Sequence, residues 1–248
     1  MINMKFRILG SASGMPTINK HHSSIWINFS DKNILLDCGE GTAKQMLKFG
    51  LDKDFLDAIV ISHYHPDHVS GLFMVIQMLY LQKRKQDLSI YLPEHIEKFK
   101  DILNLFYTFL SKIPFNIYFS LVPSLTDDFP EIDIIKSDHL LDYESIVKSN
   151  GFINEFNSYS FGINVNNKKL LYTSDCSTLK PYKSMLASTD VLIIDAMHPD
   201  SDEILELPKL SSGKIILSHG LSSKLEESLN LNKNDRFEIA DEEKEYIL

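Results

Sequence analysis

The sequence contains little cysteine and no long apolar run, and each shortage limits what the chain can be. Cys38 and Cys176 are its only cysteines, too few for a disulfide scaffold or a zinc site built from thiolates. No apolar stretch approaches the roughly 18 residues needed to span a bilayer. Residues 1–9 alternate like a strand and lack the features of a signal peptide. We therefore expect a cytoplasmic protein in a reducing compartment.

Positive charge is also scarce. The chain has 25 Lys and Arg against 34 Asp and Glu, a formal net charge of -9, which argues against holding nucleic acid by general electrostatics. The one dense basic run, Lys83-Arg84-Lys85, is interpreted as a solvated helix end. Gly39-Glu40-Gly41 lacks the GxGxxG spacing of a dinucleotide site and is interpreted as a turn.

The hydrophobic pattern predicts a mixed α/β fold. With 248 residues, 44% of them hydrophobic, the chain can bury a large core, and we expect one domain spanning 1–248. Hairpins mixed with strand-to-helix units indicate an α/β sandwich with its site along one edge. Strands are predicted at 5–9, 24–29, 33–37, 58–62, 89–92, 115–122, 132–136, 158–165, 170–173, 191–195 and 214–218, and helices at 41–49, 69–83, 94–110 and 181–187. The acidic segment 232–248 is either a short terminal strand or a frayed tail.

The densest chemical signal is His63-Tyr64-His65-Pro66-Asp67-His68, directly behind the apolar run 58–61. Neutral imidazoles and carboxylates are ligands that suit zinc, and also manganese or iron. His63 and His65 point to the same side of an extended segment and can grip one ion. Asp67 and His68, past the Pro66 turn, can reach a second. The alternative is a chance histidine-rich loop or a surface segment that scavenges metal.

Single polar residues at the ends of later strands could complete such a site. His139 follows the strand 132–136, Asp175 follows 170–173, and His219 follows 214–218. Each one alone is more often a satisfied turn residue, but the combination is far more specific.

With these residues in place, the sequence resembles the metallo-β-lactamase superfamily and, within it, the ribonuclease Z-like phosphodiesterases. The resemblance covers nearly the whole chain and rests on residues 9–16, 36–42 and 63–68 and on the isolated His139, Asp175 and His219. It implies a four-layer αββα sandwich with the site at the edge of the two sheets. It also implies a dinuclear centre in which His63, His65 and His139 hold one ion, Asp67, His68 and His219 hold the other, and Asp175 bridges them.

The resemblance further implies that Asp37 orients a ligand histidine from outside the ligand shell. Two divalent ions, zinc in preference to manganese or iron, would lower the pKa of a water from about 15.7 towards 7. Asp67 and Asp175 are the carboxylates able to orient that water or take its proton, unless they serve as ligands only.

Two segments depart from the ribonuclease Z pattern. The arm that clamps transfer RNA is expected to be absent, because residues 140–174 are taken up by the predicted 158–165 and 170–173 hairpin. The helix that the family places before its last ligand is expected to be lost between Asp195 and His219. His198 is the one histidine in that interval. It is either a displaced general acid for the leaving group or an unrelated loop residue.

Two smaller features each have two interpretations. The loop with His21 and His22 borders the substrate cleft in the resembled family, and solvent exposure is the plain alternative. Cys38 and Cys176 each follow a motif aspartate. They are interpreted as small buried side chains in preference to metal ligands or a redox switch.

The sequence therefore predicts a metal-dependent hydrolase, most simply a phosphodiesterase acting on a small or unidentified phosphodiester. The alternatives are a ribonuclease Z-type endonuclease that processes transfer RNA 3′ ends and a metal-binding module without catalysis. The expected partner is a small phosphodiester rather than nucleic acid or a membrane, and a homodimer is left open.

Overall fold

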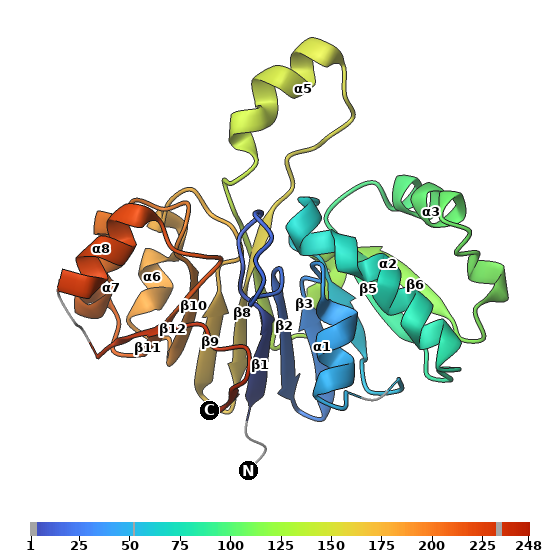
Figure 1. Ribbon diagram of the computed structural model, residues 1–248, viewed down its shortest axis with the longest axis horizontal. Helices are drawn as coiled ribbons and strands as arrows, with labels where there is room; N and C mark the ends of the chain where they lie inside the picture. Colours follow the sequence, from blue (N-terminus) through green and yellow to red (C-terminus); the bar gives the residue numbers. More distant parts are fainter. Residues whose placement is uncertain (1–3, 52, 232–234) are drawn as a thin grey trace. The chain divides into compact units, whose positions relative to one another are not determined.

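The computed structural model describes residues 4–51, 53–231 and 235–248, whose strands form two sheets (Figure 1). The chain divides into a first unit, Met1–Asp128 with Glu242–Ile247, and a second unit, Phe129–Asp241 with Leu248. Each sheet lies within one unit. Among the described residues, no helix combines the length and the hydrophobicity that a membrane crossing requires. The expectation of one domain spanning the whole chain stays a prediction.

The first unit contains a seven-stranded sheet of order β13-β1-β2-β3-β4-β5-β6, as far as the chain is described. Neighbours from β13 to β3 pair antiparallel, and neighbours from β3 to β6 pair parallel. The strands are β1 (Lys5–Gly10), β2 (Ser24–Phe29), β3 (Lys32–Leu36), β4 (Ala58–Val60), β5 (Leu88–Leu92), β6 (Ile117–Leu121) and β13 (Glu245–Ile247). The helical segments are α1 (Thr42–Lys48), α2 (Pro66–Leu81), α3 (Ile96–Leu105), η1 (Leu110–Lys112), η2 (Val122–Ser124) and α4 (Leu125–Asp128).

One row of apolar side chains across this sheet explains where its helices pack. The register aligns Trp26, Leu35, Ile59, Ile90 and Phe119 on one face. All five belong to, or pack against, a core cluster that also contains side chains of α1, α2 and α3. Because side chains alternate between the two faces of a strand, this register places all three helices on the same face of the sheet (Figure 1).

The second unit repeats this plan with a six-stranded sheet of order β12-β11-β10-β9-β8-β7 in the described residues. Strands β7 to β9 pair antiparallel and β9 to β12 pair parallel. The strands are β7 (Ile132–Lys136), β8 (Tyr159–Val165), β9 (Lys168–Tyr172), β10 (Val191–Asp195), β11 (Lys214–Ser218) and β12 (Phe237–Ile239). The helical segments are η3 (Leu141–Tyr143), α5 (Glu144–Asn150), η4 (Lys180–Tyr182), α6 (Lys183–Leu186), α7 (Ser201–Leu210) and α8 (Ser223–Leu231).

Its core is organised in the same way. Leu171, Leu192, Ile215 and Phe237 stand in register across β9, β10, β11 and β12. They share a cluster with buried side chains of α6, α7 and α8. The parallel strands of this unit are thus covered by helices on the face that carries this row, as parallel sheets require.

The structure corrects three of the expectations about secondary structure. Residues 140–174 do not hold a hairpin alone, because η3 and α5 precede it and stand clear of the sheet (Figure 1). The helix expected to be lost between Asp195 and His219 is present as α7, whose N-cap Asp200 accepts a hydrogen bond from the Asp202 amide. The predicted start of α2 at residue 69 is wrong, since the helix begins at Pro66.

The C-terminal segment was left open between strand and tail, and two of its parts are strands. β12 and β13 pair with β11 and β1. Residues 232–234 of the segment lie outside the described residues. Each of these strands has only three residues, Phe237–Ile239 and Glu245–Ile247, in an acidic segment without a continuous apolar run.

The basic run 83–85 is not a solvated helix end, because Arg84 is fully buried. Its guanidinium donates hydrogen bonds to the carbonyl oxygens of Lys53, Leu56, Gln86 and Asp87, at 2.5 to 2.7 Å. Only a planar fork with several donors can satisfy so many carbonyls at once. Arg84 therefore holds together the segments that precede β4 and β5.

We expect Arg84→Met to lower the free energy of unfolding by about 3 kcal/mol or more, because four carbonyl oxygens lose their donor. Chemical denaturation of purified protein measures this. The neighbouring exposed Lys85 provides the control, and Lys85→Met should change stability by no more than about 0.5 kcal/mol. Equal effects of the two substitutions would contradict this role for Arg84.

Candidate metal-binding residues

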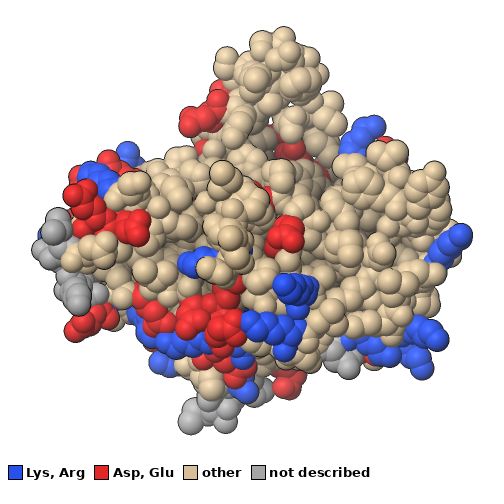
Figure 2. Space-filling view, viewed as in Figure 1, with Lys and Arg blue, Asp and Glu red and all other residues tan. Residues whose placement is uncertain are grey.

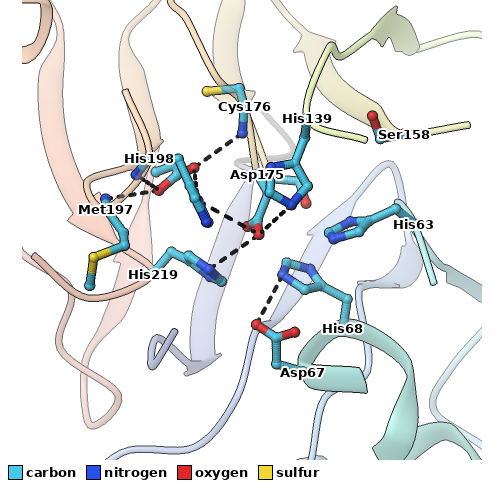
Figure 3. Close-up of polar contacts among 12 residues, drawn as sticks. His63, Asp67, His68, His139, Ser158, Asp175, Cys176, Met197, His198 and His219 are labelled. Atoms are coloured by element: carbon cyan, nitrogen blue, oxygen red, sulfur yellow. Dashed lines mark hydrogen bonds and ion pairs between the residues drawn. The ribbon is translucent and has the colours of Figure 1, made fainter. Parts of the chain in front are cut away.

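The first ligand set, His63, His65, Asp67 and His68, lies between the end of β4 and the first turn of α2. His65 is the N-cap of α2 in an extended conformation, and Pro66 occupies the first helical position, where the missing amide hydrogen costs nothing. The ring centroid of His63 lies 4.7 Å from that of His65 and 4.1 Å from that of His68. The motif thus gathers its imidazoles on one short turn, and Figure 3 shows Asp67 beside His68.

Asp37 fixes the orientation of His68. One carboxylate oxygen accepts a hydrogen bond from the Ser62 amide at 2.7 Å, and the other lies 2.9 Å from Nδ1 of His68. Both side chains are fully buried. Because a carboxylate can only accept at neutral pH, Nδ1 of His68 carries the proton and Nε2 keeps its lone pair, the form that binds metal. The contact that the resemblance implied for Asp37 is present.

Two glycines allow the chain after β3 to approach this turn. A Cβ on Gly39 would lie 2.2 Å from the carbonyl oxygen of Asp67, and a Cβ on Gly71 would lie 1.9 Å from that of Gly39. The Cys38 amide donates to the carbonyl of His68 at 2.8 Å. Any side chain at either glycine would push α2 away, so this contact explains glycine at positions 39 and 71.

The second ligand set, His139, Asp175 and His219, lies at one edge of the second sheet. β9, β10 and β11 are parallel, so Asp175 and His219, which follow β9 and β11, emerge at the same edge. β7 has the same direction as β9, because each is antiparallel to β8, and His139 follows β7. One oxygen of Asp175 lies 3.4 Å from Nε2 of His139 and 3.2 Å from Nε2 of His219 (Figure 3).

His198 joins this edge through Asp195, the last residue of β10. Nδ1 of His198 lies 2.8 Å from Oδ2 of Asp195 and 3.9 Å from Oδ2 of Asp175. Asp195 also accepts hydrogen bonds from the amides of Cys176, Met197 and His198. The side chain of His198 is 36% exposed, whereas that of Asp195 is buried. A buried carboxylate therefore holds one nitrogen of an imidazole whose ring reaches solvent.

The backbone is strained where these strands end. Asp37, Ser174 and His219 have φ angles of 58°, 50° and 61°, in the left-handed region that costs residues with a Cβ about 1 kcal/mol or more. All three are ligands or direct neighbours of proposed ligands. Such strain persists only where the surrounding packing fixes it, and the buried strands that precede these residues provide that packing.

The residues of each set suit a divalent metal ion. Ligand atoms lie within 4.8 Å of each other in four pairs: His63 and His65, Asp67 and His68, Asp175 and His139, and Asp175 and His219. Asp175, Asp195 and His198 form a further group by the same measure. Imidazoles and carboxylates are donors for zinc and manganese, and these His and Asp clusters are able to bind metal ions.

The cysteines contribute no thiolate to these clusters. Cys38 and Cys176 are fully buried, and burial raises the pKa of both thiols. The thiolate is the form that ligates metal. Their interpretation as small buried side chains is therefore confirmed.

The loop before β2 is not simply exposed to solvent. His22 is 8% exposed, and His21 Nδ1 lies 2.7 Å from a carboxylate oxygen of the buried Glu242. Glu242 and Asp195 are the two functional candidates that sequence reasoning missed. Asp195 was recognised only as a strand end, and no motif marked Glu242, 221 residues away from His21.

Known proteins with this fold define the class. The structure of YhfI from Bacillus subtilis, a metallo-β-lactamase fold protein, matches with a TM-score of 0.73 and 20% identity over 100% of both chains. Human tRNase Z, short form, matches with a TM-score of 0.66 and 20% identity over 89% of this chain and 93% of that chain. Two sheets flanked by helices in this arrangement of elements are the metallo-β-lactamase fold, and the predicted fold class is confirmed.

Sequence relatives narrow the class. Ribonuclease Z from Methanosarcina mazei is 33% identical over 102 residues, which are 41% of this chain and 33% of that protein. The chain thus spans about a third of the length of this relative. The predicted place in the metallo-β-lactamase superfamily, among its ribonuclease Z-like members, is confirmed. The family model described as Anti-Pycsar protein Apyc1 matches residues 4–246, so the chain belongs to this family.

We expect Asp37→Asn to weaken the binding of zinc or manganese by about 10- to 100-fold. If the amide oxygen keeps the Ser62 hydrogen bond, the amide nitrogen must donate to Nδ1 of His68, which moves the proton to Nε2 and blocks ligation there. Titration calorimetry on chelator-treated protein measures the affinity.

Asp31→Asn is the matched control, because Asp31 is exposed in the β2–β3 turn with φ of 60°, a conformation that asparagine tolerates. Unchanged affinity in Asp37→Asn, with the fold intact, would contradict the orienting role.

Proposed function

We propose that the chain is a metal-dependent hydrolase that cleaves small phosphodiesters. The observation that carries this proposal is the chemistry of the two ligand sets: seven buried or half-buried imidazoles and carboxylates, placed after strands or at a helix start. Membership of a metallo-β-lactamase fold family supports it. The assignment of the seven residues to two ions, made from the sequence resemblance, stays part of the proposal.

Divalent ions bound by these residues would supply a water of lowered pKa and stabilise negative charge on the phosphoryl oxygens. The chain's own groups prepare this chemistry. Asp37 keeps His68 in the ligating tautomer, and Asp175 stands within 3.4 Å of both histidines of its set. Asp67 is a proposed ligand and, with one oxygen free, a base that could take a proton from water.

His198 is proposed as the general acid for the leaving group. Its contact with Asp195 holds Nδ1 and would stabilise a protonated imidazolium, and the ring is partly exposed, so Nε2 is the nitrogen that would give its proton to a substrate. The leaving oxygen of a diester needs a proton when its alcohol is a weak acid. A histidine held by a buried carboxylate is suited to deliver it.

Small diesters are favoured over transfer RNA because of charge. The projection formed by residues 138–157 carries four acidic residues and one lysine, and on the face shown in Figure 2 it is largely uncharged. RNA affinity at physiological salt depends on several contacts between phosphates and Lys or Arg. This short projection therefore lacks the positive charge of an RNA clamp.

Two other functions remain as alternatives to this proposal. A ribonuclease Z-type endonuclease is favoured by the partial identity to ribonuclease Z. A metal-binding module without catalysis would use the same ligands. Hydrolysis assays separate the proposed phosphodiesterase from both alternatives. The phosphodiesterase and the endonuclease cleave diesters, whereas the binding module does not. Only the endonuclease prefers precursor transfer RNA.

We expect about two divalent ions per chain, since seven donors exceed the four that one tetrahedral zinc uses. Protein stripped by chelation and reloaded with zinc or manganese should hydrolyse bis-p-nitrophenyl phosphate and a cyclic mononucleotide. It should cleave precursor transfer RNA with much lower efficiency. His68→Ala should abolish most hydrolysis and lower the metal content measured by elemental analysis.

His95→Asn, a histidine outside both ligand sets, should retain activity and metal. Efficient cleavage of precursor transfer RNA at its 3′ trailer would instead establish the endonuclease. If the protein binds two ions but hydrolyses no diester, the metal-binding module without catalysis is the function that fits.

We expect His198→Ala to slow release of an alkoxide leaving group by about 100-fold or more, the usual contribution of a general acid. Release of p-nitrophenolate should slow by less than about tenfold, because this anion is stable without a proton. Steady-state rates on a matched alkyl and aryl pair of diesters measure the difference. Equal slowing of both substrates would refute the acid role and leave the metal-dependent reaction untouched.

A further inference from the structure

The carboxylate of Glu242 is the most heavily bonded acidic group among the described residues that lies outside the ligand sets. Glu242 is 8% exposed. One oxygen accepts hydrogen bonds from the amide and the hydroxyl of Ser11, at 3.0 and 3.1 Å, and from the amide of His21 at 3.1 Å. The other oxygen lies 2.7 Å from Nδ1 of His21 and accepts a hydrogen bond from the side-chain Nε2 of Gln45 at 3.2 Å.

These donors come from both ends of one loop. The segment Ser11–His22 is here named the cleft loop; Ser11 is its first residue and His21 its last but one. The Ala12 amide donates to the carbonyl of His21 at 2.8 Å. Glu242 comes from the C-terminal segment that continues into β13. A single residue near the end of the chain therefore closes a loop near its beginning.

The cleft loop in turn touches the first ligand set. A Cβ built on Gly14, near the middle of the loop, would lie 3.7 to 3.9 Å from the carboxylate atoms of Asp67. This is ordinary van der Waals distance, so the loop backbone stands directly beside a proposed metal ligand. Met15 and Ile18, on the same loop, are exposed to solvent.

A second route leads from Glu242 to the same ligand. The ring of His21, held by Glu242, lies against Gly41, where an added Cβ would come within 2.3 Å of the ring. The His22 amide donates to the carbonyl of Glu40 at 3.2 Å. This segment continues from Gly39, whose backbone abuts the carbonyl of Asp67.

We propose that Glu242 is a positioning residue: its buried carboxylate fixes the cleft loop and thereby holds Asp67 in place for metal binding and catalysis. This inference rests on the proposed function. Glu242 touches no reacting atom and acts through Gly14 and His21.

A carboxylate is required here, because both oxygens receive donors. In Glu242→Gln, the new amide group would face either the Ser11 donors or the His21 and Gln45 donors. Gln45 cannot simply flip its own amide to compensate, since its Nε2 also donates to the carbonyl of Leu9 at 3.1 Å. The substitution keeps the side-chain size, and it replaces one acceptor oxygen and the negative charge with a neutral N–H₂ donor.

The test compares Glu242→Gln with Glu243→Gln. Glu243 is the next residue, its side chain is 65% exposed, and it pairs with the half-exposed Lys48. In Glu242→Gln, amide hydrogen exchange of Ser11 and His21 should accelerate by about tenfold or more as the loop opens. Manganese affinity should fall by about tenfold, and kcat on bis-p-nitrophenyl phosphate should fall more than KM rises. Glu243→Gln should change none of these.

His21→Ala provides a second variant should Glu242→Gln fold poorly. It removes the ring from Gly41 but leaves the Ser11 contacts, so it should shift exchange and manganese affinity in the same direction and by less. Combining the two substitutions should add little to Glu242→Gln alone, because both act through one contact. A lower melting temperature with unchanged loop exchange and metal affinity would reduce Glu242 to a packing role and overturn the proposal.

Failure of the proposed function would look different. If the wild-type protein hydrolyses no diester, the phosphodiesterase proposal falls. Loop exchange and manganese affinity are measured without turnover, so they still decide whether Glu242 positions Asp67.

Discussion

The carboxylate of Asp37 ties the end of β4 to the first turn of α2, and the first ligand set depends on that tie. One oxygen accepts from the Ser62 amide and the other contacts His68, so the segment after β4 that carries His63 and the helix that carries Asp67 and His68 share one anchor. Because the side chains of Asp37 and His68 are both buried, water does not compete for the hydrogen bond between them. The φ angle of 58° at Asp37 is the local cost of placing the carboxylate there. The apolar row across β2 to β6 and the glycine contacts of α2 keep this strained residue in position.

Both units use the same rule to bring distant residues together. The carboxyl ends of parallel strands lie at one edge of a sheet. Polar residues placed just after such strands therefore lie near one another, whatever the loops between the strands. Asp175, Asp195 and His219 are separated by about twenty residues each, yet their strands deliver them to one edge. The buried carboxylates then hold the histidines beside them. Oδ2 of Asp195 lies 2.8 Å from Nδ1 of His198, and Oδ2 of Asp37 lies 2.9 Å from Nδ1 of His68.

The sequence predicted many of the strands because apolar runs leave a dense local signal, and β2, β7, β10 and β11 match their predicted bounds. The motif at 63–68 stood out by its composition, and the role of its residues as metal ligands stays a proposal. The helix α7 was missed because its segment is acidic and contains Pro208, although its buried Ile204 and Leu207 have helical spacing. Arg84 and Glu242 were missed for a different reason. Their partners are backbone groups or residues far along the chain, and no local pattern records such contacts.

The connection between β7 and β8 is closed at its base by Ser137 and Ser158. The Ser137 amide donates to the carbonyl of Ser158 at 2.8 Å, and the Ser158 hydroxyl donates to the carbonyl of Ser137 at 3.1 Å. Strand pairing therefore ends at a fixed point whatever lies beyond it. Lengthening a loop with fixed ends costs little, about 0.6 kcal/mol for each doubling. The outer part of this connection can therefore change in length and charge while the sheet below it, with the candidate ligands His139 and Asp175, stays as it is.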